Sequence, residues 1–354
     1  MNKINVLIVD DSAVVRQVLT EIVNSDPKLN VSAAVADPIF AKKRMQMQWP
    51  DVILLDVNMP RMDGIEFLRQ IMSDRPTPVV MCSALTTEGS ETAIKAMAAG
   101  AIEIIAKPKI VEKDTLTREN RRIIEAIKCA AKARNLHRLK VSQSKNTASH
   151  FKLKPPISNV APDNIIIAIG TSTGGTQALQ QVLTRLSTNC PPILIVQHMP
   201  EKFTAAFANR LNQLCAIEVK EASNGDAATP GRALIAPGGR HMKLKISDNN
   251  YVVSLDDGPP VNRHKPSVDV LFYSVARYAG KNAIGIIMTG MGNDGAHGLK
   301  DMHDSGAFTI AQDENTCVVY GMPKEAVDLG AVNKEVGLDD ISNEIMNYSL
   351  KQSA

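Results

Sequence analysis

Residues 165–175 read IIIAIGTSTGG, and this stretch decides how the second half of the chain folds. Ile165–Ile169 is an apolar run of strand length, and the glycines that follow it permit a tight turn. Ser172 lies in that turn, and a helical pattern begins at Thr176. Because further strands and helices alternate beyond it, residues 164–350 are predicted to form a doubly wound, mostly parallel-sheet α/β domain.

The first 125 residues show the same alternation of strands and helices. Five short apolar runs are separated by helical stretches; the runs are Ile4–Val9, Val31–Ala36, Asp51–Leu55, Pro78–Met81 and Ile102–Ile105. This pattern predicts an N-terminal (βα)5 domain over residues 1–125, with the carboxyl ends of its parallel strands at one edge. Residues 126–163 are predicted to be a linker, because they are rich in Lys and Arg and end in several prolines.

Composition and charge narrow the class of protein. Hydrophobic residues make up 44% and charged residues 22%, which is typical of a globular protein. The net charge of +3 is too small to indicate a nucleic-acid partner. No apolar run approaches the roughly 18 residues of a membrane span, and the five cysteines form no CxxC pair. We therefore expect a cytoplasmic protein with reduced thiols, no membrane insertion and no nucleic-acid partner.

Three acids follow strands of the first domain. Asp10 and Asp11 come after the first predicted strand, and Asp56 comes after the third. Neighbouring parallel strands would bring these carboxylates together, where they repel one another unless a cation neutralises them. Mg²⁺ suits such a site because it takes carboxylate oxygens and often accompanies a phosphoryl group. The carbonyl of Asn58, in the loop after Asp56, is a further predicted ligand.

Two more polar side chains end the next strands of this domain. Ser83 and Lys107 offer a hydroxyl and an ammonium group at the same predicted edge. Such groups can hold the oxygens of an anion while a covalent aspartyl phosphate forms on Asp56. A solvated acidic edge with a structural lysine is the alternative, and each residue taken singly fits it.

The ordered set of motifs in residues 1–125 resembles the receiver domains of two-component systems; it comprises Val9–Ser12, Leu55–Pro60, Ser83 and Lys107-Pro108. The resemblance implies phosphorylation of Asp56 by a histidine kinase, with Mg²⁺ held by Asp11, Asp56 and the Asn58 carbonyl. Many receivers carry an aromatic switch residue three positions before the lysine. Ile104 occupies that position here, so an aromatic rotamer switch is not predicted.

Ser172, His198 and Asp294 each follow an apolar strand of the second domain. The spacing Gly170-Thr171-Ser172-Thr173-Gly174 is that of a nucleophile elbow, which exposes a serine on a strand-to-helix turn. A serine nucleophile needs a base, and the base needs an acid that orients it. We therefore predict a Ser172–His198–Asp294 triad, with backbone N–H groups of Thr173 and Met291 as oxyanion donors and no cofactor.

Parts of the second domain are also compatible with other kinds of site. A glycine-rich strand–helix turn can hold a dinucleotide, but no acid follows about 20 residues later. The helix with His297, Asp301, His303 and Asp304 could bind a metal ion, although no further ligand is evident. Residues 237–242 and 259–270 could frame a substrate groove or serve as scaffolding, and His241 and His264 could be surface histidines.

The motifs of the second domain resemble those of the chemotaxis protein-glutamate methylesterases; they are Ile169–Gly175, Gln197–Met199, Ala236–Met242, His264–Phe272 and Met288–Gly295. The resemblance spans about residues 1–335. It implies hydrolysis of glutamate methyl esters on the cytoplasmic helices of methyl-accepting chemoreceptors, release of methanol, deamidation of receptor glutamines and phosphorylation by the chemotaxis histidine kinase. We expect phosphorylation of Asp56 to activate the hydrolase. The alternative is a receiver-controlled DNA-binding or adaptor protein without catalysis.

Overall fold

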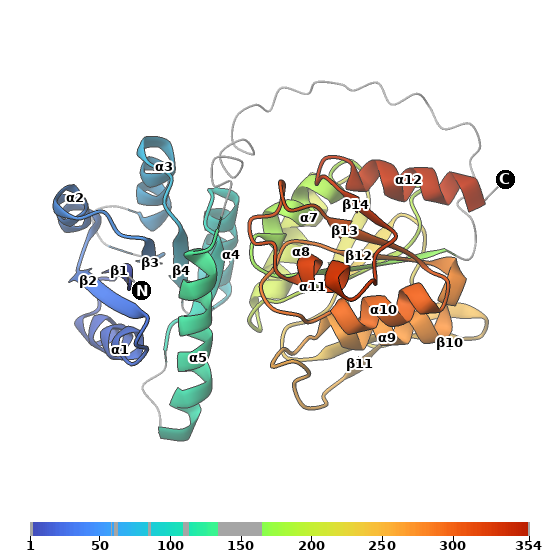
Figure 1. Cartoon of the computed structure of the whole chain (residues 1–354), viewed down its shortest axis with the longest axis horizontal. Coiled ribbons are helices and arrows are strands. Elements are labelled where there is room, and N and C mark those ends of the chain that lie inside the picture. Colours follow the sequence, from blue (N-terminus) through green and yellow to red (C-terminus); the bar gives the residue numbers. More distant parts are fainter. Residues whose placement is uncertain are drawn as a thin grey trace. The chain divides into compact units, whose positions relative to one another are not determined.

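The structure is a computed structural model of the chain and describes residues 3–57, 59, 63–83, 86–108, 113–133 and 165–352. The chain divides into two compact units, Met1–Ser144 and Lys145–Ala354. Each unit is built on its own parallel sheet with helices packed against it (Figure 1). The predicted fold class, an N-terminal (βα)5 domain followed by a doubly wound α/β domain, is therefore confirmed.

The first unit has a five-stranded parallel sheet with the order β2-β1-β3-β4-β5. The strands are β1 (Ile4–Val9), β2 (Leu29–Val35), β3 (Val52–Asp56), β4 (Val79–Ser83) and β5 (Glu103–Ala106). The helices are α1 (Ala13–Asn24), α2 (Pro38–Met47), α3 (Gly64–Asp74), α4 (Thr87–Ala98) and α5 (Lys113–Ala130). Strands β3 and β4 are buried along their whole length, as expected where helices cover both faces of a sheet.

Two helices of this unit differ from the sequence expectations. The (βα)5 pattern implies helix α2, but its bounds were not predicted, because Ile39 and Phe40 are about half exposed and its apolar residues do not mark one buried face. Helix α5 continues past the predicted domain boundary at residue 125 to Ala130. Its last turns bury Ile127 and Ala130, so the helix remains part of the domain core there. No helix in the described ranges is long and apolar enough to cross a membrane.

The second unit has a seven-stranded sheet with the order β14-β13-β12-β6-β7-β9-β8, and all its strand pairs are parallel. The strands are β6 (Ile166–Thr171), β7 (Ile193–Gln197), β8 (Glu218–Glu221), β9 (Arg232–Ile235), β12 (Ala283–Ile287), β13 (Phe308–Gln312) and β14 (Lys334–Val336). The helices are α7 (Gly175–Leu183), α8 (Phe203–Leu214), α9 (Val268–Tyr278), α10 (Ala296–Asp304), α11 (Met322–Asp328) and α12 (Ile341–Gln352), with a 3₁₀ turn at Gly280–Asn282.

The path of the chain through this sheet reverses direction at the central strand. The chain starts in the middle at β6, passes to β7, continues to the edge strand β8 and back to β9, and then crosses to β12 on the other side of β6. Such a reversal is a topological switch point, and ligands of open α/β sheets bind outside the carboxyl ends of the strands there. A functional site is therefore expected at the carboxyl ends of β6, β7 and β12.

A separate hairpin joins the two halves of this sheet in sequence. It consists of β10 (His241–Ser247) and β11 (Asn250–Asp256), which pair in antiparallel register. Asp248 and Asn249 connect them with φ angles of 49° and 61°. Two successive left-handed residues form a type I′ turn, which Asn and Asp tolerate better than most residues. The chain can therefore reverse directly between β10 and β11.

Gly64 allows α3 to begin against the backbone that carries Asp56. A Cβ atom built on Gly64 would lie 2.2 Å from the carbonyl oxygen of Asp56 and 2.9 Å from that of Val57. Asp63, the residue before it, caps the helix by accepting a hydrogen bond from the amide of Ile65 (3.1 Å). The Asp63-Gly64 pair thus fixes where α3 starts relative to the end of β3.

We predict that Gly64→Ala destabilises the first unit by about 1–3 kcal/mol, because a methyl group would have to displace main-chain atoms. Urea denaturation followed through the fluorescence of Trp49, the chain's one tryptophan, reports on this unit. Arg69→Ala, on the exposed side of the same helix, is the control and should change the unfolding free energy by less than about 0.5 kcal/mol. Equal stabilities for both variants would contradict this role of Gly64.

Candidate functional site

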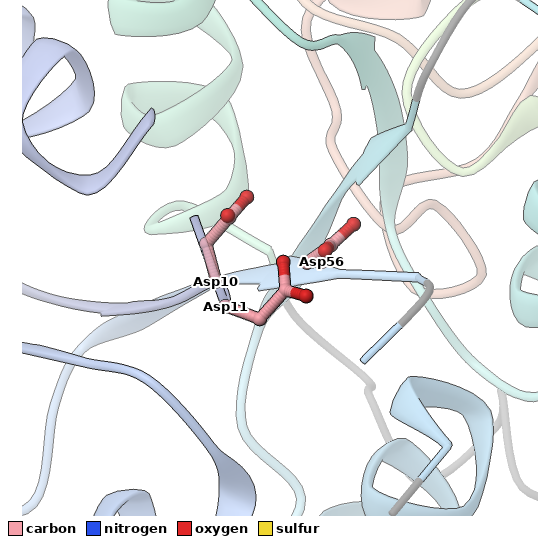
Figure 2. A group of neighbouring side chains, drawn as sticks. All are labelled: Asp10, Asp11 and Asp56. Atoms are coloured by element: carbon pink, nitrogen blue, oxygen red, sulfur yellow. The ribbon is translucent and has the colours of Figure 1, made fainter. Parts of the chain in front are cut away.

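The three acids of the first unit lie together at the carboxyl edge of its sheet. Val9 pairs with Leu55, so the residues that follow β1 stand beside the end of β3. One oxygen from each of Asp10, Asp11 and Asp56 lies within 4.8 Å of the others (Figure 2). Asp10 and Asp56 are buried, whereas Asp11 is exposed.

Lys107 neutralises part of this negative charge. Its ammonium lies 3.0 Å from Asp10 Oδ2 and 2.8 Å from Asp56 Oδ2. Burial by itself would lower the pKa of Lys107, but hydrogen bonds to Asp56 and Asp10 outweigh it and raise that pKa above its ordinary value. The amide of Lys107 donates to the carbonyl of Ser83 (2.9 Å), so Ser83 also ends at this edge. Asn58, the other predicted ligand, lies outside the described residues.

This edge has the donor chemistry that Mg²⁺ requires. The ion prefers carboxylate oxygens and retains several waters, so an open cluster with two buried acids and one exposed acid fits it. Within the described ranges, Asp10, Asp11 and Asp56 are the only group of His, Cys, Asp and Glu side chains placed to hold a metal ion. The predicted alternative on α10 is not such a group.

Ser172, His198 and Asp294 meet at the switch point of the second unit. Ser172 directly follows β6 and His198 directly follows β7, while Asp294 lies in the loop after β12. The amide of Ser172 donates to the carbonyl of Thr289 (3.0 Å), and the amide of His198 donates to the carbonyl of Thr171 (3.1 Å). These bonds join the three strand ends into one continuous edge.

His198 and Asp294 form a close pair. His198 Nε2 lies 2.8 Å from Asp294 Oδ2, and only 6% and 1% of the two side chains are exposed. His198 Nδ1 is buried and hydrogen-bonds to none of the described residues, Ser172 included. Since a carboxylate accepts hydrogen bonds only, Nε2 carries a proton, and in the neutral ring Nδ1 then presents a lone pair. In enzymes without substrate, the hydrogen bond between the base and the nucleophile is often long. The lack of a hydrogen bond between His198 Nδ1 and Ser172 is therefore compatible with the predicted triad.

The carboxylate of Asp294 is held from several directions. Its Oδ1 accepts hydrogen bonds from Ser267 Oγ (2.7 Å) and Asn262 Nδ2 (2.9 Å). Its Oδ2 accepts one from the amide of Val268 (2.7 Å), the first residue of α9, in addition to that from His198. Burial by itself would raise the pKa of Asp294, but the hydrogen bonds from His198, Ser267 and Asn262 lower it well below its ordinary value. Asp294 therefore stays ionised.

A second carboxylate, that of Asp269, also accepts a hydrogen bond from the start of a helix. Asp269, in the first turn of α9, accepts a hydrogen bond from the amide of Gly298 in α10 (2.6 Å). Asp294, just before α10, in turn caps α9. Each acid thus satisfies the free N–H groups at the start of the other's helix, where the helix dipole also favours negative charge. Helices α9 and α10, which lie side by side in Figure 1, are tied together at the site.

The turn around Ser172 leaves no room for larger residues at two glycines. Gly174 adopts a φ angle of 78° at the start of α7, and a Cβ there would also meet Val318 at 2.6 Å. A Cβ on Gly290 would lie 2.7 Å from that of Ser172. The loops containing Thr173 and Met291 therefore adjoin at Ser172. Their N–H groups remain predicted oxyanion donors.

Comparisons with known proteins identify the family of each unit. Residues 167–345 match the CheB methylesterase family, and residues 6–119 match the response regulator receiver domain. A protein-glutamate methylesterase/protein-glutamine glutaminase 2 from Hahella chejuensis is 56% identical over 360 residues, covering 99% of this chain and 98% of the relative. A protein-glutamate methylesterase/protein-glutamine glutaminase 3 from Leptospira interrogans is 55% identical over 346 residues, covering 98% and 100%. The chain belongs to the CheB methylesterase family.

A solved structure of the family matches the second unit. The crystal structure of the Thermotoga maritima CheB methylesterase catalytic domain is 36% identical, covers 53% of this chain and 100% of its own, and has a TM-score of 0.52. Both resemblances drawn from the sequence are thus confirmed: the chain joins a receiver domain to a methylesterase domain.

Sequence reasoning missed several residues of the methylesterase site. Asn262 and Ser267 contact Asp294, and the His264 ring stacks on that of His198. His241, which the sequence allowed at the surface, is only 2% exposed. It accepts a hydrogen bond from the amide of Ser267 (3.2 Å), and its Nε2 contacts the carbonyl of Pro259 (3.0 Å), so it supports the loop that carries these residues.

We predict that Asp294→Asn destabilises the methylesterase domain by roughly 3 kcal/mol at pH 7, because it breaks a buried charged network. The depressed pKa means that the carboxylate contributes fully above the unfolded-state value of about 3.9 and loses that contribution as the pH falls below it. The difference in unfolding free energy between wild type and Asp294→Asn should therefore be smaller at pH 3.5 than at pH 7.

Urea denaturation followed by circular dichroism at pH 7, 5 and 3.5 measures this difference. Asp339→Asn is the control, since Asp339 forms an exposed ion pair with Arg185 and should contribute less than about 1 kcal/mol. A wild-type advantage over Asp294→Asn that is as large at pH 3.5 as at pH 7 would contradict the assigned ionisation.

Proposed function

We propose that the methylesterase domain hydrolyses glutamate methyl esters on chemoreceptor cytoplasmic helices and deamidates receptor glutamines, under control of phosphorylation at Asp56. The observation that carries this proposal is the His198–Asp294 pair, 2.8 Å apart and beside Ser172 at the switch point of the sheet. The names of the relatives, protein-glutamate methylesterase/protein-glutamine glutaminase, support the substrate class. A substrate on such helices would place the protein in the cytoplasm.

Hydrolysis would begin with attack of Ser172 Oγ on the carbonyl carbon of the ester. The hydroxyl proton passes to His198 Nδ1, and the resulting imidazolium is stabilised by Asp294 through Nε2. The N–H groups of Thr173 and Met291 would hydrogen-bond the oxyanion of the tetrahedral intermediate, where each such donor is typically worth about 10²–10³ in rate.

His198 would then return its proton to the leaving group. Collapse of the intermediate expels methanol and leaves Ser172 esterified by the glutamyl side chain. A water molecule, deprotonated by His198, attacks this acyl-enzyme and regenerates Ser172 with a free glutamate. With a glutamine substrate the same steps release ammonia instead of methanol, because only the leaving group differs.

The receiver domain would supply control. Asp56 is the proposed phosphoacceptor and the chemotaxis histidine kinase the phosphodonor, with Mg²⁺ held by Asp10, Asp11, Asp56 and Asn58. When bound, Mg²⁺ supplies positive charge that the phosphoryl oxygens can contact. Ser83 and Lys107, at the adjacent strand ends, would contact those oxygens as well. A phosphoryl group adds about −1.5 to −2 charge at Asp56, which biases the receiver between two states.

We predict that full-length wild type releases methanol from receptor membranes whose glutamates carry a radiolabelled methyl ester, and that acetyl phosphate with Mg²⁺ increases the rate. Ser172→Ala should lower release by about 10⁴–10⁶, since a triad acts as a unit. Asp56→Asn should keep the unstimulated rate and lose the increase, because it removes the phosphoacceptor.

Two matched variants control for loss of a hydroxyl and of a carboxylate. Ser247→Ala lies in the β10–β11 hairpin, and Asp51→Asn changes an exposed acid at the start of the strand that ends in Asp56. Both should behave as wild type. Retention of most activity by Ser172→Ala would remove this serine from the mechanism. An absence of methanol release, together with a sequence-dependent DNA shift, would favour the DNA-binding alternative.

A further inference from the structure

The segment Val261–His264 forms a tight turn beside the triad. Val261 and His264 pair through their main chains, with hydrogen bonds of 3.1 Å and 2.9 Å. Asn262 and Arg263 between them have φ angles of 50° and 70°. Two left-handed residues in succession again give a type I′ geometry, in which asparagine is favoured. The backbone of the turn fixes the direction in which the side chains of Asn262 and His264 project.

His264 covers one face of the His198 ring. The ring centroids are 3.7 Å apart and the ring planes differ by 2°, so the two imidazoles are stacked in parallel. The contact restrains rotation of the His198 ring out of the plane in which Nε2 meets Asp294.

Asn262 contacts the acid on the side away from His198. Its Nδ2 donates to Asp294 Oδ1 (2.9 Å) and to Asp269 Oδ2 (2.6 Å). Burial raises the pKa of Asp269, and the nearby charge of Asp294 raises it further, so the two carboxylates oppose each other's ionisation. The amide group between them offsets that repulsion and leaves Asp294 Oδ2 to face His198.

We propose that residues 261–264 are a turn clamp that positions the His198–Asp294 pair for catalysis. Asn262 and His264 are its positioning residues: one holds the acid and the other holds the base, and neither is assigned a role in bond making. The clamp keeps Nε2 on Asp294 and thereby keeps Nδ1 available to Ser172. This inference rests on the proposed roles of Ser172 and His198.

The clamp is tested by the rate at which a fluorophosphonate probe labels Ser172 in the full-length chain. This reaction reports activation of the serine without any receptor substrate. Asn262→Gly keeps the left-handed turn and removes the amide, while His264→Ala removes the ring. Each should slow labelling roughly tenfold or more, as small displacements of catalytic groups do. His264→Phe keeps a flat ring and should recover the rate to within about threefold of wild type.

A matched control comes from the β10–β11 hairpin. Asn249 has the same left-handed conformation as Asn262, and Asn249→Gly should label at the wild-type rate. Methanol release from methylated receptor membranes adds a second readout. There, Asn262→Gly and His264→Ala should lower kcat roughly tenfold and leave KM within about twofold, because the clamp contacts the catalytic pair rather than the substrate.

Labelling of Asn262→Gly and His264→Ala at the wild-type rate would overturn the clamp. The clamp would also be overturned if His264→Phe were labelled as slowly as His264→Ala and both variants had lower unfolding temperatures. That result would indicate a purely structural turn. Wild type that is not labelled at Ser172 would overturn the proposed nucleophile and the clamp with it. If wild type is labelled and the clamp variants are labelled more slowly, but no methanol is released, the proposed substrate is rejected and the clamp is upheld.

Discussion

The carboxylate of Asp294 is the group on which the architecture of the methylesterase domain depends. An ionised carboxylate that is buried costs several kcal/mol unless hydrogen bonds replace the water it has lost. Here those bonds come from Ser267, Asn262, the first amide of α9 and His198. The acid proposed to orient His198 therefore also accepts the first amide of α9, and Asp269 in turn accepts an amide of α10. The hydrogen bonds that stabilise the fold around Asp294 are thus the same ones that orient its carboxylate toward His198.

Sheet topology explains why three residues so distant in sequence come together. The chain crosses from β7 and its neighbours back to β12 on the other side of β6, so Asp294 returns to a site that Ser172 and His198 formed more than ninety residues earlier. The order serine, histidine, acid differs from that of α/β hydrolases. The shared feature is the carboxyl edge of a parallel sheet, where loops can differ while the strands hold their ends in place. The receiver domain uses the same edge of its own sheet for Asp10, Asp56 and Lys107.

Much of this arrangement was predictable from sequence, because apolar runs mark buried strands and polar residues directly after them mark their ends. Ser172, His198 and Asp294 were found in this way. The roles of Asn262 and His264 were not, because they depend on a left-handed turn and on a ring contact between residues 66 positions apart. His241 gave no signal of burial, since its partners are main-chain groups of a distant loop. The bounds of helix α2 could not be predicted, because Ile39 and Phe40 are about half exposed. Sequence patterns thus locate elements and their ends, whereas side-chain orientation depends on tertiary contacts.

The central claim is that Asp294 holds the Nε2–H form of His198, so that Nδ1 is the base. Nitrogen NMR of the full-length chain with ¹⁵N-labelled histidine measures this directly, and a His198→Gln variant assigns the signal among the seven histidines. We expect a protonated Nε2 and, in the neutral ring, an unprotonated Nδ1. A proton on Nδ1, with Nε2 bare, would contradict it, since Asp294 could not then accept a hydrogen bond from the ring.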